Sequence, residues 1–160
     1  MAAKAQAIPK GYHTVTPSLF VAGAARAIDF YKKALGAEEL MRFAGPDGKI
    51  MHAEIKVGDS IIMLADEMPD QGGRSPKSIG GTPVSFFVYG EKVDAAWKRA
   101  VDAGAKPIVP LADQFWGDRA GCLEDPFGHQ WWLAQHIQDL TPEEIRKNAE
   151  SFLSQMQPAS

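Results

Sequence analysis

Cysteine is almost absent from this chain of 160 residues, and Cys122 is the single example. One cysteine excludes an internal disulfide and every zinc site built from several cysteines, as expected for a protein of a reducing compartment. We expect Cys122 to be a buried structural thiol, because no basic residue stands beside it in the sequence to activate it as a nucleophile.

Long apolar runs and an excess of basic residues are also missing. No stretch approaches the roughly 20 apolar residues of a membrane helix, and Met1 to Lys10 contains no apolar core of signal-peptide length. The chain has 17 Lys and Arg residues against 20 Asp and Glu residues, which leaves too few cations for a nucleic-acid-binding surface. We therefore expect a soluble, cytoplasmic protein of one domain, with neither nucleic acid nor a membrane as its partner.

Hydrophobic periodicity predicts short strands mixed with helices. Ala27, Ile28 and Tyr31 recur at helical spacing, and Gly36 follows them where a C-terminal cap belongs. Residues 50–57 instead alternate between apolar and polar side chains, which is typical of a strand. The predicted strands are 15–21, 40–43, 50–57, 61–65, 83–89, 106–110, 120–124 and 130–135, and the predicted helices are 24–35, 93–103 and 141–155.

The last predicted helix has a clear beginning and one apolar side. Thr141 is expected to cap it, with Pro142 at the first helical position and Glu144 reaching back in a capping box. Apolar residues then recur every three to four positions, so we expect one buried stripe on a helix packed outside the domain. The stripe consists of Ile145, Ala149, Phe152 and Met156.

The chain contains the same succession of elements twice: a strand, a helix and three strands. Thr16-Pro17 corresponds to Thr82-Pro83, and other matches keep offsets between 66 and 70 residues. A sheet with one helix on one face needs a cover for its other face. We expect the other half to provide it, which leaves a cup between two curved sheets. The predicted fold is α+β, with a tail at 1–12, a first βαβββ module at 13–67, a linker at 68–81, a second module at 82–137, and the C-terminal helix and tail at 138–160.

Two motifs give this repeat a family resemblance. They are AIDFYKKALGA at residues 27–37 and DPFGHQW at residues 125–131. With them, residues 14–137 resemble the vicinal oxygen chelate superfamily of glyoxalases, bleomycin-resistance proteins and extradiol dioxygenases. KIMHAE at 49–54 and DQFWGDR at 113–119 resemble its PhnB-like branch more narrowly. The resemblance implies two paired βαβββ modules and a homodimer, which in some members exchanges modules.

The resemblance also implies positions for a metal ion. Metal-dependent members carry His, Glu or Gln ligands on the first and last strand of each module. The corresponding residues in this sequence are Thr16, Met63, Ser85 and Trp132. None of these side chains is a usual ligand of a divalent cation, so we expect no metal site and no other cofactor.

His52 and Glu54 are the alternative candidates for chemistry. Period two places both side chains on one face of a strand, where they form a catalytic or metal-binding pair or simply line a polar, solvated surface. His13 precedes the first strand, but nothing in the sequence brings it to them. Surface positions are expected for His129 and His136.

The aromatic residues favour ligand binding when they are taken as a set, although each ring by itself is better explained as core. Together they form a wall that suits a flat or apolar ligand. We predict a metal-independent small-molecule-binding protein, resembling bleomycin-resistance proteins that sequester a drug. The alternative is a glyoxalase-like lyase or isomerase that uses Glu54 as base, with or without a metal at His52. The predicted ligand-binding residues are Phe20, Met63, Phe87, Tyr89, Phe115, Trp116, Arg119 and Trp132. We expect Trp132 to project into the cup while Trp131 packs toward the helix.

Overall fold

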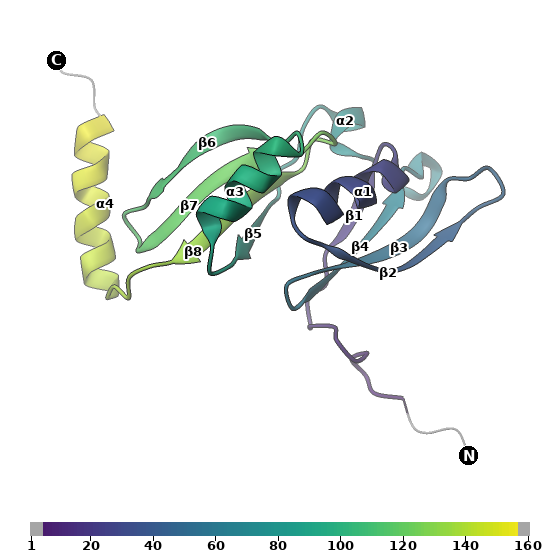
Figure 1. The fold of residues 1–160 in the computed structure, drawn as a ribbon, viewed down its shortest axis with the longest axis horizontal. Coiled ribbons are helices and arrows are strands. Elements are labelled where there is room, and N and C mark those ends of the chain that lie inside the picture. Colours follow the sequence, from purple (N-terminus) through teal and green to yellow (C-terminus); the bar gives the residue numbers. More distant parts are fainter. Residues whose placement is uncertain (1–4, 157–160) are drawn as a thin grey trace.

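The computed structural model describes residues 5–156 and contains two sheets and a layer of helices (Figure 1). The first four residues of the expected tail and the last four residues of the chain lie outside the described part. The strands are β1 (Ser18–Val21), β2 (Glu38–Ala44), β3 (Ile50–Val57), β4 (Ser60–Asp66), β5 (Ser85–Tyr89), β6 (Lys106–Asp113), β7 (Asp118–Glu124) and β8 (Gln130–His136), and the helices are α1 (Ala24–Ala34), η1 (Pro69–Gln71, a 3-10 turn), α2 (Pro76–Ile79), α3 (Val93–Asp102) and α4 (Pro142–Met156).

The predicted α+β fold of two βαβββ modules is confirmed. The first sheet has the strand order β1-β4-β3-β2 and the second has the order β5-β8-β7-β6, so the same topology occurs twice. In each sheet the first and last strands of the module are parallel, and the other neighbours are antiparallel. The first strand begins at Ser18 rather than at Val15, because Pro17 has no amide hydrogen to give to a ladder.

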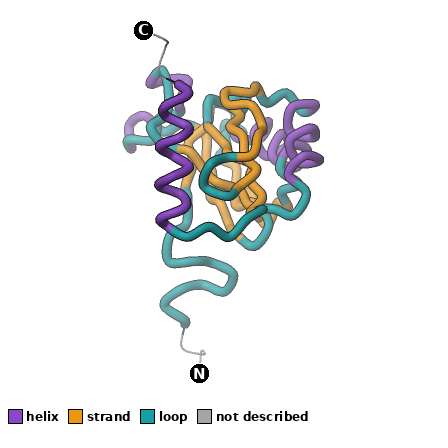
Figure 2. The backbone as a smooth tube through the Cα atoms, turned by 90° about the vertical axis from the view of Figure 1, so that its left-hand side faces the viewer, coloured by secondary structure: helices purple, strands orange, loops and turns teal. Residues whose placement is uncertain are grey.

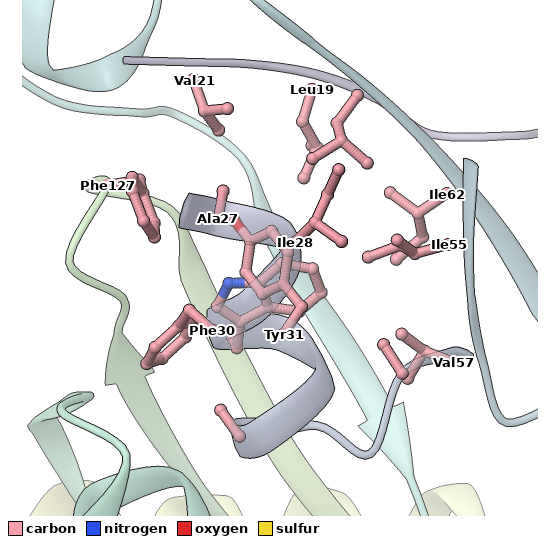
Figure 3. Packing of buried hydrophobic residues seen from close by; sticks show 14 of the residues in the cluster. Leu19, Val21, Ala27, Ile28, Phe30, Tyr31, Ile55, Val57, Ile62 and Phe127 are labelled. Carbon is pink, nitrogen blue, oxygen red and sulfur yellow. The ribbon is translucent and has the colours of Figure 1, made fainter. Parts of the chain in front are cut away.

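Helix α1 packs against the first sheet through the predicted apolar side. Ala27, Ile28 and Tyr31 are fully buried. Side chains from β1, β3 and β4 converge on this side of the helix, and Phe127 of the second half approaches from the opposite direction (Figure 3). Period two along the strands therefore sends the alternate side chains to the face of the sheet away from the helix.

The two halves are joined by a buried polar and aromatic cluster. Helices α1 and α3 contact each other, and the carboxylate of Asp125 connects the halves. It accepts hydrogen bonds from the Tyr31 hydroxyl at 2.7 Å, from the Trp131 indole at 2.8 Å, and from the backbone amides of Phe127 at 2.8 Å and His129 at 3.0 Å. The tyrosine ring lies 5.3 Å from the Trp131 ring, so the repeat is held together by specific contacts in its core.

His129 belongs to this junction, so the predicted surface position is wrong. Its side chain is buried, and Nε2 lies 3.2 Å from the backbone oxygen of Phe20 in the other half. The turn before β8 carries the residue into the contact between the halves, which sequence spacing alone does not indicate.

The halves lie side by side, so neither sheet covers the other as the sequence suggested. Helices α1 and α3 lie on one side of the molecule (Figure 1). Helix α2 contacts the edge strand β1, and neither α1 nor α3 lies on the opposite face of its sheet (Figure 1). We call this face the open face of each sheet. The hollow between the halves is consequently a groove at their junction, described below.

Helix α4 stands at one end of the molecule, apart from both sheets (Figures 1 and 2). The predicted capping box is confirmed, since Glu144 accepts a hydrogen bond from the Thr141 amide at 2.8 Å. The predicted buried stripe is wrong for the single chain, because none of the helix residues is buried. The helix is held by Phe152, whose ring lies 5.4 Å from that of Phe115, and by Asn148, whose amide donates to the Phe115 carbonyl at 3.2 Å. No helix of the described chain has the length and apolar character needed to cross a bilayer.

Candidate functional site

The open face of the second sheet carries a group of aromatic rings, which we call the aromatic face: Phe87, Tyr89, Trp116 and Trp132. The Phe87 and Trp132 rings are stacked with centroids 5.1 Å apart and an interplanar angle of 2°. Tyr89 stacks on Phe87 at 6.2 Å, and Trp116 meets Trp132 edge to face at 6.4 Å. Phe87 and Tyr89 are 46% and 60% exposed, so a large aromatic surface is open in the chain.

The strand register produces this grouping. Parallel pairing of β5 with β8 places Phe87 opposite Trp132, and alternation turns their neighbours Phe86 and Trp131 toward the helices. Trp116 comes from the tight turn before β7, where the Gln114 amide bonds the Asp118 carbonyl at 2.7 Å. The predicted opposite directions of Trp131 and Trp132 are confirmed.

Asp118 lies beneath the aromatic face and fixes two of its rings. Its carboxylate is almost fully buried, and Oδ2 accepts hydrogen bonds from the Tyr89 hydroxyl and from the Trp116 indole, both at 2.9 Å. Oδ1 lies 2.7 Å from Nδ1 of His136. A single carboxylate therefore holds the tyrosine, the tryptophan and the histidine in place.

The hydrogen bonds of this cluster shift the pKa values of Asp118 and His136 in the directions that favour their charged forms. Burial acts to raise the pKa of Asp118, but the hydrogen bonds from His136, Tyr89 and Trp116 outweigh burial and leave it below the usual range. The pKa of His136 is raised by its hydrogen bond to Asp118 and by a second one to Asp139, at 2.9 Å. Asp118 is therefore ionised at neutral pH.

A groove lies where the two halves meet, beside the aromatic face. It has a volume of about 550 Å³ and is lined by residues of both halves, including Pro17 and Ile61 from the first and Phe87 and Tyr89 from the second. This volume falls within the range that holds small molecules. His13 also lines it, so the structure brings this histidine to the groove rather than to His52.

The open face of the first sheet carries a smaller polar cluster. Nε2 of His52 lies 3.1 Å from Oε1 of Glu54, so the structure brings the alternative catalytic pair together. Hydrogen bonds from Tyr12 and then from His52 lower the pKa of the Glu54 carboxyl. Met63 stands beside Glu54 in the ladder between β3 and β4. A lowered pKa makes this carboxylate a weaker base than an ordinary glutamate.

The positions that the resemblance assigns to a metal ion do not fit one. Register places Ser18 beside Met63 and Phe87 beside Trp132, while Thr16 precedes β1. The Trp132 ring stacks on Phe87 and offers no donor atom to a cation. The donor types at these positions therefore differ from those that a divalent ion prefers.

The other predicted ligand-binding residues, apart from Arg119, lie in two places. Phe115 extends the aromatic face, since its ring meets Trp116 edge to face at 5.0 Å. Phe20 and Met63 belong to the first sheet, away from the aromatic face, and the Phe20 ring packs against Gly73 of the connecting segment.

The expectation that Arg119 points into the site is wrong. Its guanidinium binds Asp94 of α3 at 2.7 Å and Asp113 of β6 at 3.0 Å, on the helix side of the second sheet. The residue follows Asp118 in a strand, so alternation directs the two side chains to opposite faces.

The structure adds Tyr12 and His136, which the sequence did not assign to a site. A signal for His136 is present, since it follows Trp132 by four residues in one strand and period two puts both on the same face. No sequence signal brings Tyr12 to Glu54, because this contact depends on the path of the segment before β1.

Residues 12–133 match the sequence model of the Glyoxalase/Bleomycin resistance protein/Dioxygenase superfamily. Among curated relatives, the uncharacterized protein Rv0887c of Mycobacterium tuberculosis (strain H37Rv) is 47% identical over 135 residues, which are 82% of this chain and 79% of the relative.

Solved structures with the same fold include two of moderate sequence identity. TioX from Micromonospora sp. ML1 has a TM-score of 0.61 and 27% identity, covering 81% of this chain and 100% of that one. The product of Arabidopsis thaliana gene At5g48480 has a TM-score of 0.62 and 28% identity, covering 77% of this chain and 98% of that one.

Proposed function

Because the chain belongs to the glyoxalase/bleomycin resistance protein/dioxygenase superfamily, we propose that it is a metal-independent protein that binds a planar, largely apolar small molecule. The ligand lies on the aromatic face and extends into the groove between the halves. The superfamily includes bleomycin-resistance proteins, so sequestration of such a ligand, and with it resistance to a toxic compound, is the corresponding biological role.

One observation carries this proposal: the rings of Phe87 and Trp132 form an exposed, parallel stack. Trp132 stands at a position where metal-dependent relatives carry a metal-ligating residue. The two rings are 2° from parallel and continue into Tyr89. A flat ring gains dispersion and desolvation energy by extending such a stack. The adjoining groove of about 550 Å³ gives room for a ligand of drug size.

Acridine, a flat three-ring compound, is a direct probe of this function. Trp132→Ala should weaken acridine binding by about 1–3 kcal/mol, as for an aromatic contact at the centre of a site. Quenching of tryptophan fluorescence in the parent should shrink in this variant and persist in Trp97→Phe, which changes a tryptophan of α3 on the helix side. If the parent and Trp132→Ala bound acridine with equal affinity, Trp132 would be a core residue and not part of the binding site.

A homodimer is the second part of the proposal. Members of this superfamily are often dimers, and the open faces of both sheets lack a covering helix in the described chain. Exposed apolar side chains on the first sheet, such as Met41 and Phe43, favour contact with a second copy. Pairing across chains would bring the open face of one first sheet to the aromatic face of its partner.

The close pair of His52 and Glu54 supports the second candidate, a lyase or isomerase that uses Glu54 as base. Their 3.1 Å separation and the neighbouring Tyr12 form an acid–base cluster. The analysis of divalent metals in protein purified without chelators distinguishes the two functions. About one ion per chain that is lost in Glu54→Gln and His52→Gln would favour the enzyme over the metal-independent binder.

A further inference from the structure

Two rings of the aromatic face donate hydrogen bonds to one buried carboxylate. Asp118 is 3% exposed, and its Oδ2 receives the Tyr89 hydroxyl and the Trp116 indole N–H at 2.9 Å each. Both donors belong to side chains whose rings face the open side. The negative charge is therefore connected directly to the surface on which the proposed ligand lies.

A hydrogen bond to an ionised acceptor polarises its donor. An O–H or N–H that donates to a carboxylate shifts electron density into its own ring, because hydrogen-bonded groups in a poorly screened environment polarise one another. The ring faces of Tyr89 and Trp116 consequently become more negative. Such faces attract a cation more strongly than they attract a neutral ring of the same shape.

Neither Lys106 nor Arg119, the lysine and the arginine of the second sheet, offsets this charge. Arg119 is bound to Asp94 and Asp113 on the helix side, and Lys106 stands opposite Glu124 at the far end of β7. His136 is the cationic partner at the near end, and it is shared between Asp118 and Asp139. Two carboxylates therefore surround one histidine beside the aromatic face.

We infer that the aromatic face selects planar ligands that carry a positive charge, with Asp118 as the residue that positions the rings and sets this preference. The inference rests on the proposed binding function and names the chemical class of its ligand. A protonated or quaternised aromatic nitrogen that lies over the ring face of Tyr89 or Trp116 has the complementary charge. An anionic ring of the same shape is disfavoured.

Two probes of nearly equal shape test the preference in the unaltered protein. They are 10-methylacridinium, which is a cation, and 9-methylacridine, which is neutral in mildly alkaline buffer. Calorimetry should give a dissociation constant about tenfold lower for the cation, within the range expected for a cation over aromatic rings. Equal constants would overturn the charge selectivity and leave the binding function intact, whereas no binding of either probe would overturn the binding function itself.

Asp118→Asn tests the residue that sets the preference. Asparagine keeps an oxygen acceptor for the rings but removes the charge, so the ratio of the two constants should fall to about twofold or less. Asp113→Asn is the matched control, because it removes the same charge from an exposed position on the helix side and should keep the ratio of the parent. A folded Asp118→Asn protein with an unchanged ratio would overturn the role of Asp118. The comparison of the probes in the parent protein holds even where the variant does not fold.

Discussion

Asp118 and Asp125 are 3% and 2% exposed, yet they serve different parts of the molecule. Asp125 receives four donors from both halves, and all of these donors belong to the core. Asp118 receives donors from side chains that face the open side of the sheet. At the scale of single residues, buried carboxylates thus connect the repeat in one place and organise the candidate site in the other.

Tyr31→Phe should destabilise the protein, because it leaves the buried Asp125 carboxylate without one of its donors. The expected loss in the free energy of unfolding is about 1–3 kcal/mol, measured by urea denaturation. Tyr89→Phe is the control: it removes the same group from Asp118, but Tyr89 is 60% exposed and water can replace its hydroxyl. Equal losses in the two variants would contradict the importance of the junction between the halves.

His136 should make stability depend on pH, since its contact with Asp118 and then Asp139 raises its pKa in the folded state. A raised pKa contributes stability that is fully present below the pKa of the unfolded chain and is lost as pH rises through the folded value. The difference in unfolding free energy between the parent and His136→Gln should therefore decrease as pH increases from about 5.5 to about 9. Chemical denaturation across this range measures it, and a difference that grows with pH would contradict the interpretation.

At the scale of elements, helix α3 approaches β7 closely at Gly121. A Cβ atom there would lie 2.6 Å from the Trp97 ring and 2.8 Å from the backbone of Leu111 in β6. Because Gly121 has no side chain, helix α3 and the irregular edge strand β6 can both pack closely against β7.

Gly121→Ala should destabilise the fold by about 1–3 kcal/mol, as expected for an atom forced into a packed core. Gly90→Ala provides a matched control, because no heavy atom lies within 4 Å of a Cβ at that position. Thermal unfolding of both variants tests the packing. Equal melting temperatures of the two variants would show that Trp97 and Leu111 do not pack tightly against Gly121.

Helix α4 is held mainly by two side chains, so we expect its removal to have a small effect on stability. Deletion of residues 141–160 should lower the melting temperature by about 2–4 °C, equivalent to about 1 kcal/mol for a chain of this size, because the helix is anchored mainly through Phe152 and Asn148. The affinity for acridine should stay within a few-fold of the parent. Complete loss of binding by a folded, truncated chain would assign the helix to the site.

At the scale of the whole molecule, one topology has produced two unlike open faces. The first sheet presents a histidine, a glutamate and methionines, whereas the second presents stacked aromatic rings. A homodimer that pairs the two kinds of face would enclose a site with one polar and one aromatic side. Neither face is covered by a helix in the described chain.

Light scattering during size-exclusion chromatography should give twice the mass of the chain. Phe43→Asp places a charge on the open face of the first sheet and should shift the protein toward a monomer, since an unpaired charge is costly at an interface. Ile79→Asp introduces the same charge at an exposed position of α2, outside both sheets, and should leave the mass unchanged. A monomeric parent protein would remove the homodimer from the proposal.

The local pattern of the sequence determined the elements and the direction of many side chains. Period two distinguished Trp131 from Trp132, helical spacing identified the buried side of α1, and the capping box placed the start of α4. These features depend on neighbours within a few residues, where backbone geometry fixes which face a side chain occupies. The repeat, with its offsets of 66 to 70 residues, likewise belongs to the sequence alone.

Only the tertiary structure decided how distant residues meet. The side-by-side packing of the halves, the burial of His129 and the contact of Tyr12 with Glu54 depend on turns and on the relative placement of two sheets. Arg119 faces the helix side because it alternates with Asp118 along β7, and its salt bridges join it to Asp113 of the neighbouring strand and to Asp94 of α3. The exposed stripe of α4 has the same origin: periodicity shows that a helix has an apolar side, but whether that side is buried depends on what the rest of the chain places against it.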